Sequence, residues 1–299
     1  MKYLPALLAI NSLLALGLQP QIASATTLYN GSGLPEEQGW IAPGAVGSNG
    51  LPIATFNVTP GTDGVTVQTD NIDSSSGATA TSGYLGYSNY TASPNTATPD
   101  PFDAELNLIN PAFPVLNADD GYSIFFDVAV DPVPETDPNR ASFSLLVVSS
   151  DKTKSIELDF EADLVFAQSD ADNGSGLSEF TRAETSTPID TSIIRSYELK
   201  ADSSTYELLA DNTSILTGNL RDYEFDADNS EPSLPFDPYE TPNFLFFGDL
   251  TDQAAGSFTL GEVRVENAIA STPEFSPVFT ITLLGIGMGV QKLAQKNLL

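Results

Sequence analysis

Residues 143–167, FSLLVVSSDKTKSIELDFEADLVFA, contain three short apolar runs separated by polar turns. The runs Phe143–Val148, Ser155–Phe160 and Leu164–Ala167 are rich in β-branched and aromatic residues. The second run alternates apolar with polar or acidic side chains, which is typical of a β-strand because successive side chains point to opposite faces. The stretch therefore predicts three consecutive strands.

The same signals recur along the rest of the chain. Further strands are predicted at 53–58, 64–68, 122–130, 196–199, 205–209, 244–247 and 258–265. Clusters of Pro, Asn, Asp and Gly separate them and act as turns, whereas 69–102 and 222–243 are predicted as long loops. The fold class expected is all-β, with two antiparallel sheets packed as a jelly-roll or concanavalin-like sandwich.

The chain is strongly acidic. Of its 299 residues, 40 are Asp or Glu and 11 are Lys or Arg, giving a net charge of -29, and it contains no His or Cys. A Ser-His-Asp triad, a Cys nucleophile, a disulfide and a Cys/His zinc site are therefore excluded. The shortage of basic residues excludes nucleic acid as a partner, because binding a phosphate backbone requires clustered Lys and Arg.

The N-terminal residues 1–25 have the pattern of a secretory signal peptide. Lys2 is followed by an apolar run and then by the small residues Ala23-Ser24-Ala25. Such a pattern predicts cleavage by signal peptidase after Ala25 and export of the remaining chain. The alternative is a membrane anchor that is not cleaved.

The C-terminal residues 269–299 form a spacer and a hydrophobic tail. Pro273-Glu274 precedes the uncharged apolar run 278–290, which is followed by Lys292 and Lys296. This arrangement resembles the PEP-CTERM sorting signal, a bacterial tail that an exosortase recognises and cuts near the Pro-Glu. The resemblance implies a short hydrophobic helix that lies in the membrane before processing. A plain C-terminal membrane tail is the alternative.

Residues 26–268 are expected to form one domain. Several of their motifs, LYNG at 28–31, SIELDF at 155–160 and PNFLFFGD at 242–249, resemble a cyanobacterial choice-of-anchor extracellular domain. This resemblance implies a sandwich with no assigned catalysis, located at the cell surface, in the outer envelope or in the extracellular matrix of a Gram-negative-type bacterium such as a cyanobacterium.

One strand could carry chemistry. Glu157, Asp159 and Glu161 stand at alternate positions, so their carboxylates would line one face of the strand. The spacing is similar to the Glu-x-Asp-x-Glu strand of concanavalin-fold β-glucanases, which implies Glu157 as nucleophile and Glu161 as acid/base. The simpler interpretation is a half-exposed strand with its acidic residues in water.

Two further sets of residues are candidate binding groups. Tyr84, Tyr87 and Tyr90 could stack on sugar rings if they lie on a surface loop. Clustered oxygens in turns, such as Asp119-Asp120-Gly121, suit Ca²⁺, and the residues proposed as its ligands are Asp170, Asp172 and Asp249. Ordinary turns with solvated carboxylates are the alternative interpretation, so Ca²⁺ is a candidate and no other cofactor is expected.

The sequence as a whole predicts an exported, surface-anchored or matrix-associated protein that is not an enzyme. Its expected partners are signal peptidase, an exosortase-like enzyme and extracellular polysaccharide. Two alternatives stay open, a lectin-like carbohydrate-binding module and a glycoside hydrolase that uses Glu157 and Glu161.

Overall fold

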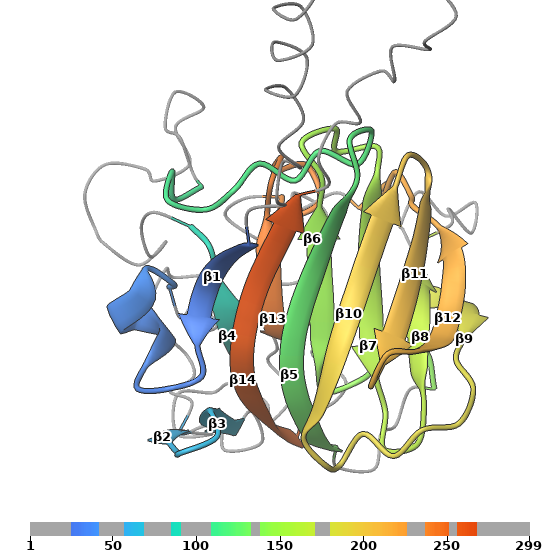
Figure 1. Ribbon diagram of the computed structural model, residues 1–299. Coiled ribbons are helices and arrows are strands. Elements are labelled where there is room, and N and C mark those ends of the chain that lie inside the picture. Colours follow the sequence, from blue (N-terminus) through green and yellow to red (C-terminus); the bar gives the residue numbers. More distant parts are fainter. Residues whose placement is uncertain are drawn as a thin grey trace, which may run out of the picture. The chain divides into compact units, whose positions relative to one another are not determined.

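The computed structural model describes residues 25–41, 57–68, 85–90, 109–132, 138–170, 180–225, 237–250 and 256–267. These residues form two antiparallel sheets packed face to face (Figure 1), so the predicted all-β sandwich is confirmed. The predicted C-terminal helix lies outside the described residues. Within the described ranges, no helix has the length and apolar character needed to cross a membrane.

The larger sheet, called sheet A here, has eight strands. Its order is β12-β11-β10-β5-β14-β3-β2, and β1 pairs with the C-terminal part of β14. The strand bounds are β1 Ala25–Asn30, β2 Asn57–Pro60, β3 Val65–Gln68, β5 Tyr122–Pro132, β10 Arg195–Asp202, β11 Thr205–Ala210, β12 Thr213–Asn219 and β14 Gly256–Asn267.

The smaller sheet, sheet B, has six strands in the order β4-β13-β6-β7-β8-β9. Their bounds are β4 Leu85–Ser88, β6 Ser144–Val148, β7 Ser155–Phe160, β8 Val165–Ser169, β9 Thr181–Thr185 and β13 Leu245–Asp249. A short 3-10 helix, η1, spans Pro35–Gln38 after β1.

The main core lies between the two sheets and is rich in aromatic rings. Phe126 of β5 stacks on Tyr197 of β10 at 5.3 Å and meets the edge of Phe247 of β13 at 5.5 Å. The only tryptophan, Trp40, is 2% exposed, and its indole N–H donates to the carbonyl of Leu28 at 2.9 Å. Each such ring buries a large apolar area, which makes this layer the main source of stability.

A second, smaller apolar cluster covers the outer face of sheet B. Its members come from β6 and β13 and from the segments that follow β4, β12 and β13 or precede β13: Tyr90, Leu146, Val148, Tyr223, Tyr239, Phe244, Phe246 and Leu250. Sheet B is therefore buried on both faces, which explains why every residue of β6 and β7 is buried.

The structure corrects the predicted loop at 69–102, because β4 lies within it. Gly86 in this strand faces the backbone of β13, where a Cβ atom would lie 2.3 Å from the carbonyl oxygen of Phe247. Such a close approach requires glycine, which weakens the strand signal in the sequence. The strands β1, β9 and β12 were also not predicted.

Candidate functional site

The candidate catalytic strand is β7, and its acidic residues face away from the main core. Ile156, Leu158 and Phe160 belong to the inter-sheet core, so Glu157 and Asp159 point to the outer face of sheet B. Both carboxyl groups are nevertheless 0% exposed, because the second apolar cluster lies over them. The predicted face is correct, whereas the expectation of solvated carboxylates is wrong.

Asp159 is held by three hydrogen bonds. Its carboxylate accepts from the Ser144 hydroxyl at 2.6 Å, the Gln168 amide at 2.6 Å and the backbone N–H of Ala141 at 3.2 Å. Burial raises the pKa of Asp159, while the nearby Arg140 cation and these donors act in the opposite direction. Three donors aimed at one carboxylate favour its ionised form.

Glu157 has a different environment. The Tyr239 hydroxyl donates to Glu157 Oε2 at 2.5 Å, and the closest Arg140 nitrogen lies 3.8 Å from Oε1. Burial raises the pKa of Glu157 to about 8, with a further increase from Asp159 and an opposing effect of Arg140. At neutral pH the raised pKa therefore favours the protonated form of Glu157.

Glu161, the third predicted catalytic residue, follows the last residue of β7. Its side chain forms an ion pair with Arg182 of β9 and is 21% exposed. Arg182 also lies over the ring of Phe166, with its guanidinium carbon 4.1 Å from the ring centre. Glu161 therefore belongs to an ion pair with Arg182 that does not include Glu157 or Asp159. Glu157 has no exposed atoms that a substrate could reach.

The predicted sugar-stacking tyrosines are not on the surface where the structure describes them. Tyr87 is 0% exposed in the inter-sheet core, and Tyr90 is 3% exposed and stacked on Phe244 at 4.7 Å. Neither ring offers a face to a sugar, so the prediction is wrong for these two residues. Tyr84 lies outside the described residues.

The predicted calcium ligands are not assembled into a site in the described part of the chain. Asp170 accepts hydrogen bonds from the backbone amides of Glu224 and Phe225, and burial raises its pKa to about 6. Asp249 is 2% exposed at the end of β13. No group of three acidic residues there could hold a metal ion, and Asp172 lies outside the described residues.

Of the predicted processing residues, Ala25 is the first residue of β1. The others lie outside the described residues: Ala23, Pro273, Glu274, Lys292 and Lys296. Cleavage at either end of the chain therefore stays a prediction.

A polar pocket of about 270 Å³ lies at one end of sheet A. Three adjacent strands supply its lining, from the start of β5 and the ends of β10 and β14: Asp120, Gly121, Tyr122, Ser123, Lys200, Ala201, Asp202, Glu266 and Asn267. Ser123 is paired with Lys200 on one side and Glu266 on the other, so these three side chains share the outer face of the sheet.

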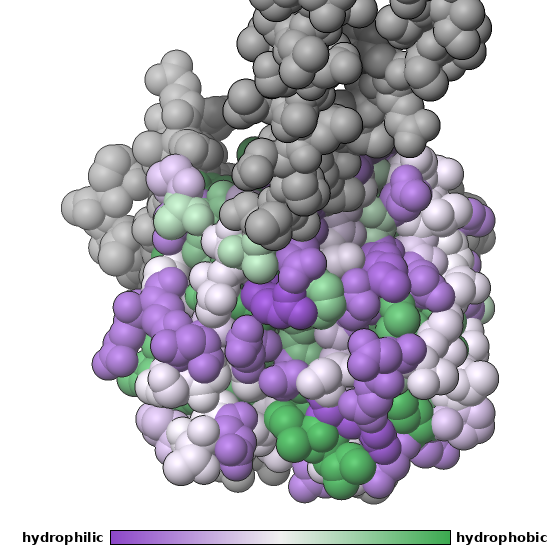
Figure 2. All heavy atoms as spheres, in the orientation of Figure 1, coloured by the Kyte–Doolittle hydropathy of each residue, from purple (hydrophilic) through white to green (hydrophobic). Residues whose placement is uncertain are grey.

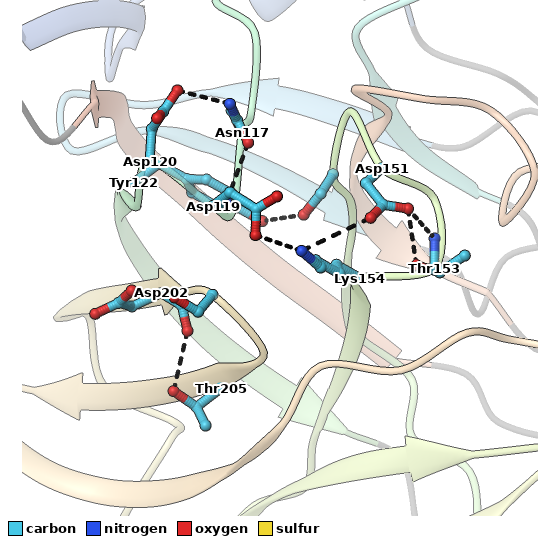
Figure 3. A network of polar contacts seen from close by, with 11 residues as sticks. Asn117, Asp119, Asp120, Tyr122, Asp151, Thr153, Lys154, Asp202 and Thr205 are labelled. Atoms are coloured by element: carbon cyan, nitrogen blue, oxygen red, sulfur yellow. Dashed lines mark hydrogen bonds and ion pairs between the residues drawn. The ribbon is translucent and has the colours of Figure 1, made fainter. Parts of the chain in front are cut away.

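The turns around this pocket are fixed by polar contacts (Figure 3). The Asn117 amide donates to Asp120 at 2.6 Å, and Lys154 donates to Asp119 at 2.5 Å. The backbone N–H of Ser203 donates to the carbonyl of Ala118 at 2.6 Å, which joins the β10–β11 turn to the turn before β5. The pocket rim is therefore ordered before any ligand binds.

The pocket contains both hydrogen-bond acceptors and donors. Asp120, Asp202 and Glu266 supply carboxylate oxygens and Lys200 supplies a donor. The Ser123 hydroxyl donates to Glu198 at 3.0 Å, so it offers its lone pairs as an acceptor. Lys200 lies 3.7 Å from Glu198 and 3.8 Å from Glu207, so the local charge is negative. Hydrophilic side chains cover much of the outer face of sheet A in the view of Figure 2. A neutral, hydroxyl-rich ligand fits this chemistry better than a polyanion.

Comparison with known proteins gives distant likenesses of fold. No family model and no curated protein matches the chain. Among solved structures, a carbohydrate esterase from the Shiga toxin-encoding bacteriophage phi24B is 13% identical with a TM-score of 0.48, covering 82% of this chain and 100% of its own.

Two others illustrate the range of these likenesses. An alginate lyase of polysaccharide lyase family 7 is 9% identical with a TM-score of 0.40, covering 77% of this chain and 95% of its own. The carbohydrate binding module CBM66 from Bacillus subtilis is 12% identical with a TM-score of 0.32, again covering 77% and 95%.

These comparisons correct one prediction. The sequence was interpreted as that of a protein that is not an enzyme, yet the similar solved structures include an esterase and a lyase as well as a binding module. The prediction of a protein without catalysis is therefore wrong on this finding, and it is withdrawn.

Proposed function

We propose that this protein is exported and binds polysaccharide outside the cell through the polar pocket at the end of sheet A. The observation that supports this proposal is the pocket itself, in which acceptors and donors from three neighbouring strands line an open depression of about 270 Å³. Sugar hydroxyl groups both donate and accept hydrogen bonds, so they need such a mixed lining. Sites for small molecules have volumes of about 300–1,000 Å³, which makes this pocket suitable for a chain end or a single sugar unit.

Charge supports the choice of ligand. The chain carries a net charge of -29, and the lining of the pocket contains three carboxylates and one Lys. Repulsion at this level disfavours anionic polysaccharides at low salt and leaves neutral ones unaffected. We infer a neutral glycan as the ligand.

The test is a glycan array followed by calorimetry with the neutral oligosaccharides that bind. Ser123→Ala and Asp202→Ala should each weaken binding by about tenfold, the effect of one lost hydrogen bond of about 1.4 kcal/mol. Asp131→Ala is the matched control, because Asp131 is exposed at the far end of β5 on the same face as Ser123. No binding to any neutral glycan, or equal loss in Asp131→Ala, would contradict the proposal.

The binding assay should also record whether the glycan is cleaved or deacylated. Chromatography of the ligand after incubation measures this directly, and it covers the catalytic functions that the withdrawn prediction had excluded. A change in the ligand that Ser123→Ala prevents would place that reaction at the same pocket.

The sorting signals complete the proposal. We propose that signal peptidase removes residues 1–25, and that an exosortase-like enzyme cuts the PEP-CTERM-like tail near Pro273-Glu274 after the tail has held the protein at the membrane. The acidic composition and the choice-of-anchor resemblance support a location at the cell surface or in the matrix. Intact-mass measurement of the protein from the producing cells tests this, with Thr26 expected as the first residue. A mass that includes residues 278–299 would refute removal of the tail.

A further inference from the structure

The second apolar cluster has a different construction from the main core. Part of it is strand residues of sheet B, and part is a cover formed by two segments, Tyr223–Phe225 after β12 and residues 237–241 before β13. The rings of this cover pack on one another, with centres 4.9 Å apart for Tyr223 and Tyr239 and 5.3 Å for Phe225 and Tyr239. The inter-sheet core does not include these rings, so the cover can leave without opening the sandwich.

The contacts that hold the cover end on a buried ionisable cluster. The Tyr239 hydroxyl donates to Glu157 at 2.5 Å. The Tyr223 oxygen accepts from the backbone N–H of Glu157 at 2.8 Å and donates to the carbonyl of Gln168 at 3.0 Å. The Asp170 carboxylate accepts hydrogen bonds from the backbone amides of the two residues after Tyr223. Two of these contacts, at the side chains of Glu157 and Asp170, therefore end on ionisable groups, whereas those of Tyr223 end on backbone atoms.

Three groups and burial determine the pKa of Glu157. Arg140, from the segment before β6, favours the ionised form, and the Tyr239 hydroxyl acts in the same direction. Asp159, two residues along β7, opposes ionisation, and burial beneath the cover opposes it most strongly. The pKa of Tyr223 is raised by burial and by the charges of Glu157 and Asp170, and Arg221 acts in the opposite direction. One cation thus faces two carboxyl groups, so a second negative charge has no partner unless water reaches it.

We propose that the cover is a pH-sensitive element, which separates from the outer face of sheet B when Glu157 loses its proton while the two sheets stay packed. Separation gives water access to the second carboxylate and exposes the apolar side chains of Leu146, Val148 and Phe246. The cover thereby couples pH to the exposure of an apolar surface that is buried at low pH.

The direction of the effect follows from linkage. Burial raises the pKa of Glu157 from 4.5 to about 8 when the cover is closed, and hydration returns it toward 4.5 when the cover is open. The closed state therefore binds the proton more tightly, and the population of the open state rises by about tenfold per pH unit between these two values. Above about pH 8 the increase stops, because both states are then ionised.

Hydrogen exchange of the full chain tests the proposal. Protection factors, corrected for the intrinsic rate, are measured at pH 5, 6.5 and 8 for peptides from the cover and from β5. The cover should be less protected than β5 at each pH and should lose about tenfold in protection per pH unit. Emission of Trp40, the only tryptophan, reports the inter-sheet core and should stay unchanged.

Two variants complete the experiment. Glu157→Gln keeps the shape of the side chain and cannot ionise, so the cover should lose its pH dependence between pH 6.5 and 8, where Asp170, with a pKa raised to about 6, is already ionised. Tyr239→Phe removes the hydroxyl contact with Glu157 and keeps the ring, so protection of the cover should fall about tenfold already at pH 5. Equal protection of cover and β5, or the same pH dependence in Glu157→Gln as in the natural protein, would overturn the proposal.

Discussion

The buried carboxyl group of Glu157 makes an unusual prediction: its replacement by Gln should stabilise the protein. Glu157 is 0% exposed, and burial raises its pKa from 4.5 to about 8. The unfolded chain ionises near pH 4.5, whereas the folded protein holds the proton until about pH 8. Folding is therefore opposed increasingly as the pH rises between these values, and the loss is complete above pH 8.

The magnitude follows from the two pKa values. One pKa unit corresponds to 1.36 kcal/mol, so the full loss between pH 4.5 and 8 is on the order of 5 kcal/mol for the state in which the cover is closed, and opening of the cover sets its upper limit. Gln cannot ionise, and its carbonyl oxygen can accept the Tyr239 hydroxyl as the carboxyl group does. We therefore expect Glu157→Gln to match the natural protein within about 1 kcal/mol near pH 4.5 and to exceed it by several kcal/mol at pH 8.

The assay is urea unfolding followed by Trp40 fluorescence at pH 5, 6.5 and 8. Other carboxylates contribute their own pH dependence, but they are present in both proteins, so the difference between the two stability curves isolates Glu157. A difference that stays constant with pH would show that Glu157 does not hold a proton. A variant less stable than the natural protein at pH 8 would refute the reasoning, because Glu157 would then be the ionised partner of Arg140.

Three further variants test other parts of the structure. Asp159→Asn should lower the free energy of unfolding by about 3 kcal/mol in urea at pH 7, because three donors lose a charged acceptor at about 1 kcal/mol each. Gly86→Ala should lower the melting temperature and detach β4, since its Cβ would lie 2.3 Å from the Phe247 carbonyl oxygen; unchanged exchange in β4 would contradict this. Trp40→Phe should cost about 2–4 kcal/mol in chemical unfolding, from lost packing and from the hydrogen bond to Leu28; a neutral result would refute the buried position of the indole.

The strands that the sequence predicted well are those whose alternation reflects the inter-sheet core. β5 and β7 place apolar side chains at every second position, β14 does so on either side of a bulge between Leu260 and Val263, and these side chains form that core. The missed strands β9 and β12 lie at sheet edges and are polar, with few buried residues. An edge strand has one partner and little apolar area to bury, so its sequence resembles that of a loop.

The burial of Glu157 could not be predicted from its own strand. Alternation correctly placed it on the outer face, but the residues that cover it come from far along the chain. Tyr223 is 66 residues away and Tyr239 is 82 residues away. The segments that carry them appear as acidic, Pro-rich loops in the sequence. Whether a polar side chain meets water is thus decided by tertiary contacts of segments with no regular pattern.

The polar pocket was equally inaccessible to sequence analysis. Its lining joins residues 120–123, 200–202 and 266–267, which come together only because β5 lies between β10 and β14. The sequence did single out Asp119 and Asp120, as oxygen ligands for a cation. In the structure Asp119 pairs with Lys154 instead, and only Asp120 lines the pocket.

The two outer faces of the sandwich differ in what they offer to a ligand. Sheet A presents an outer face with hydrophilic side chains over much of it (Figure 2), and an open pocket lies at the end of this sheet where β5 begins. Sheet B carries the carboxyl pair that a glycosidase would need, but Glu157 there is covered and protonated at neutral pH, and a protonated carboxyl group is a poor nucleophile. For Glu157 to act in catalysis, the cover would have to be removed and the pKa of Glu157 would have to fall. Removal of the cover lets water reach the carboxyl group, and this hydration lowers its pKa. Glu157→Gln separates the alternatives, because it stabilises the fold in either case but abolishes a reaction only if the carboxylate takes part in it.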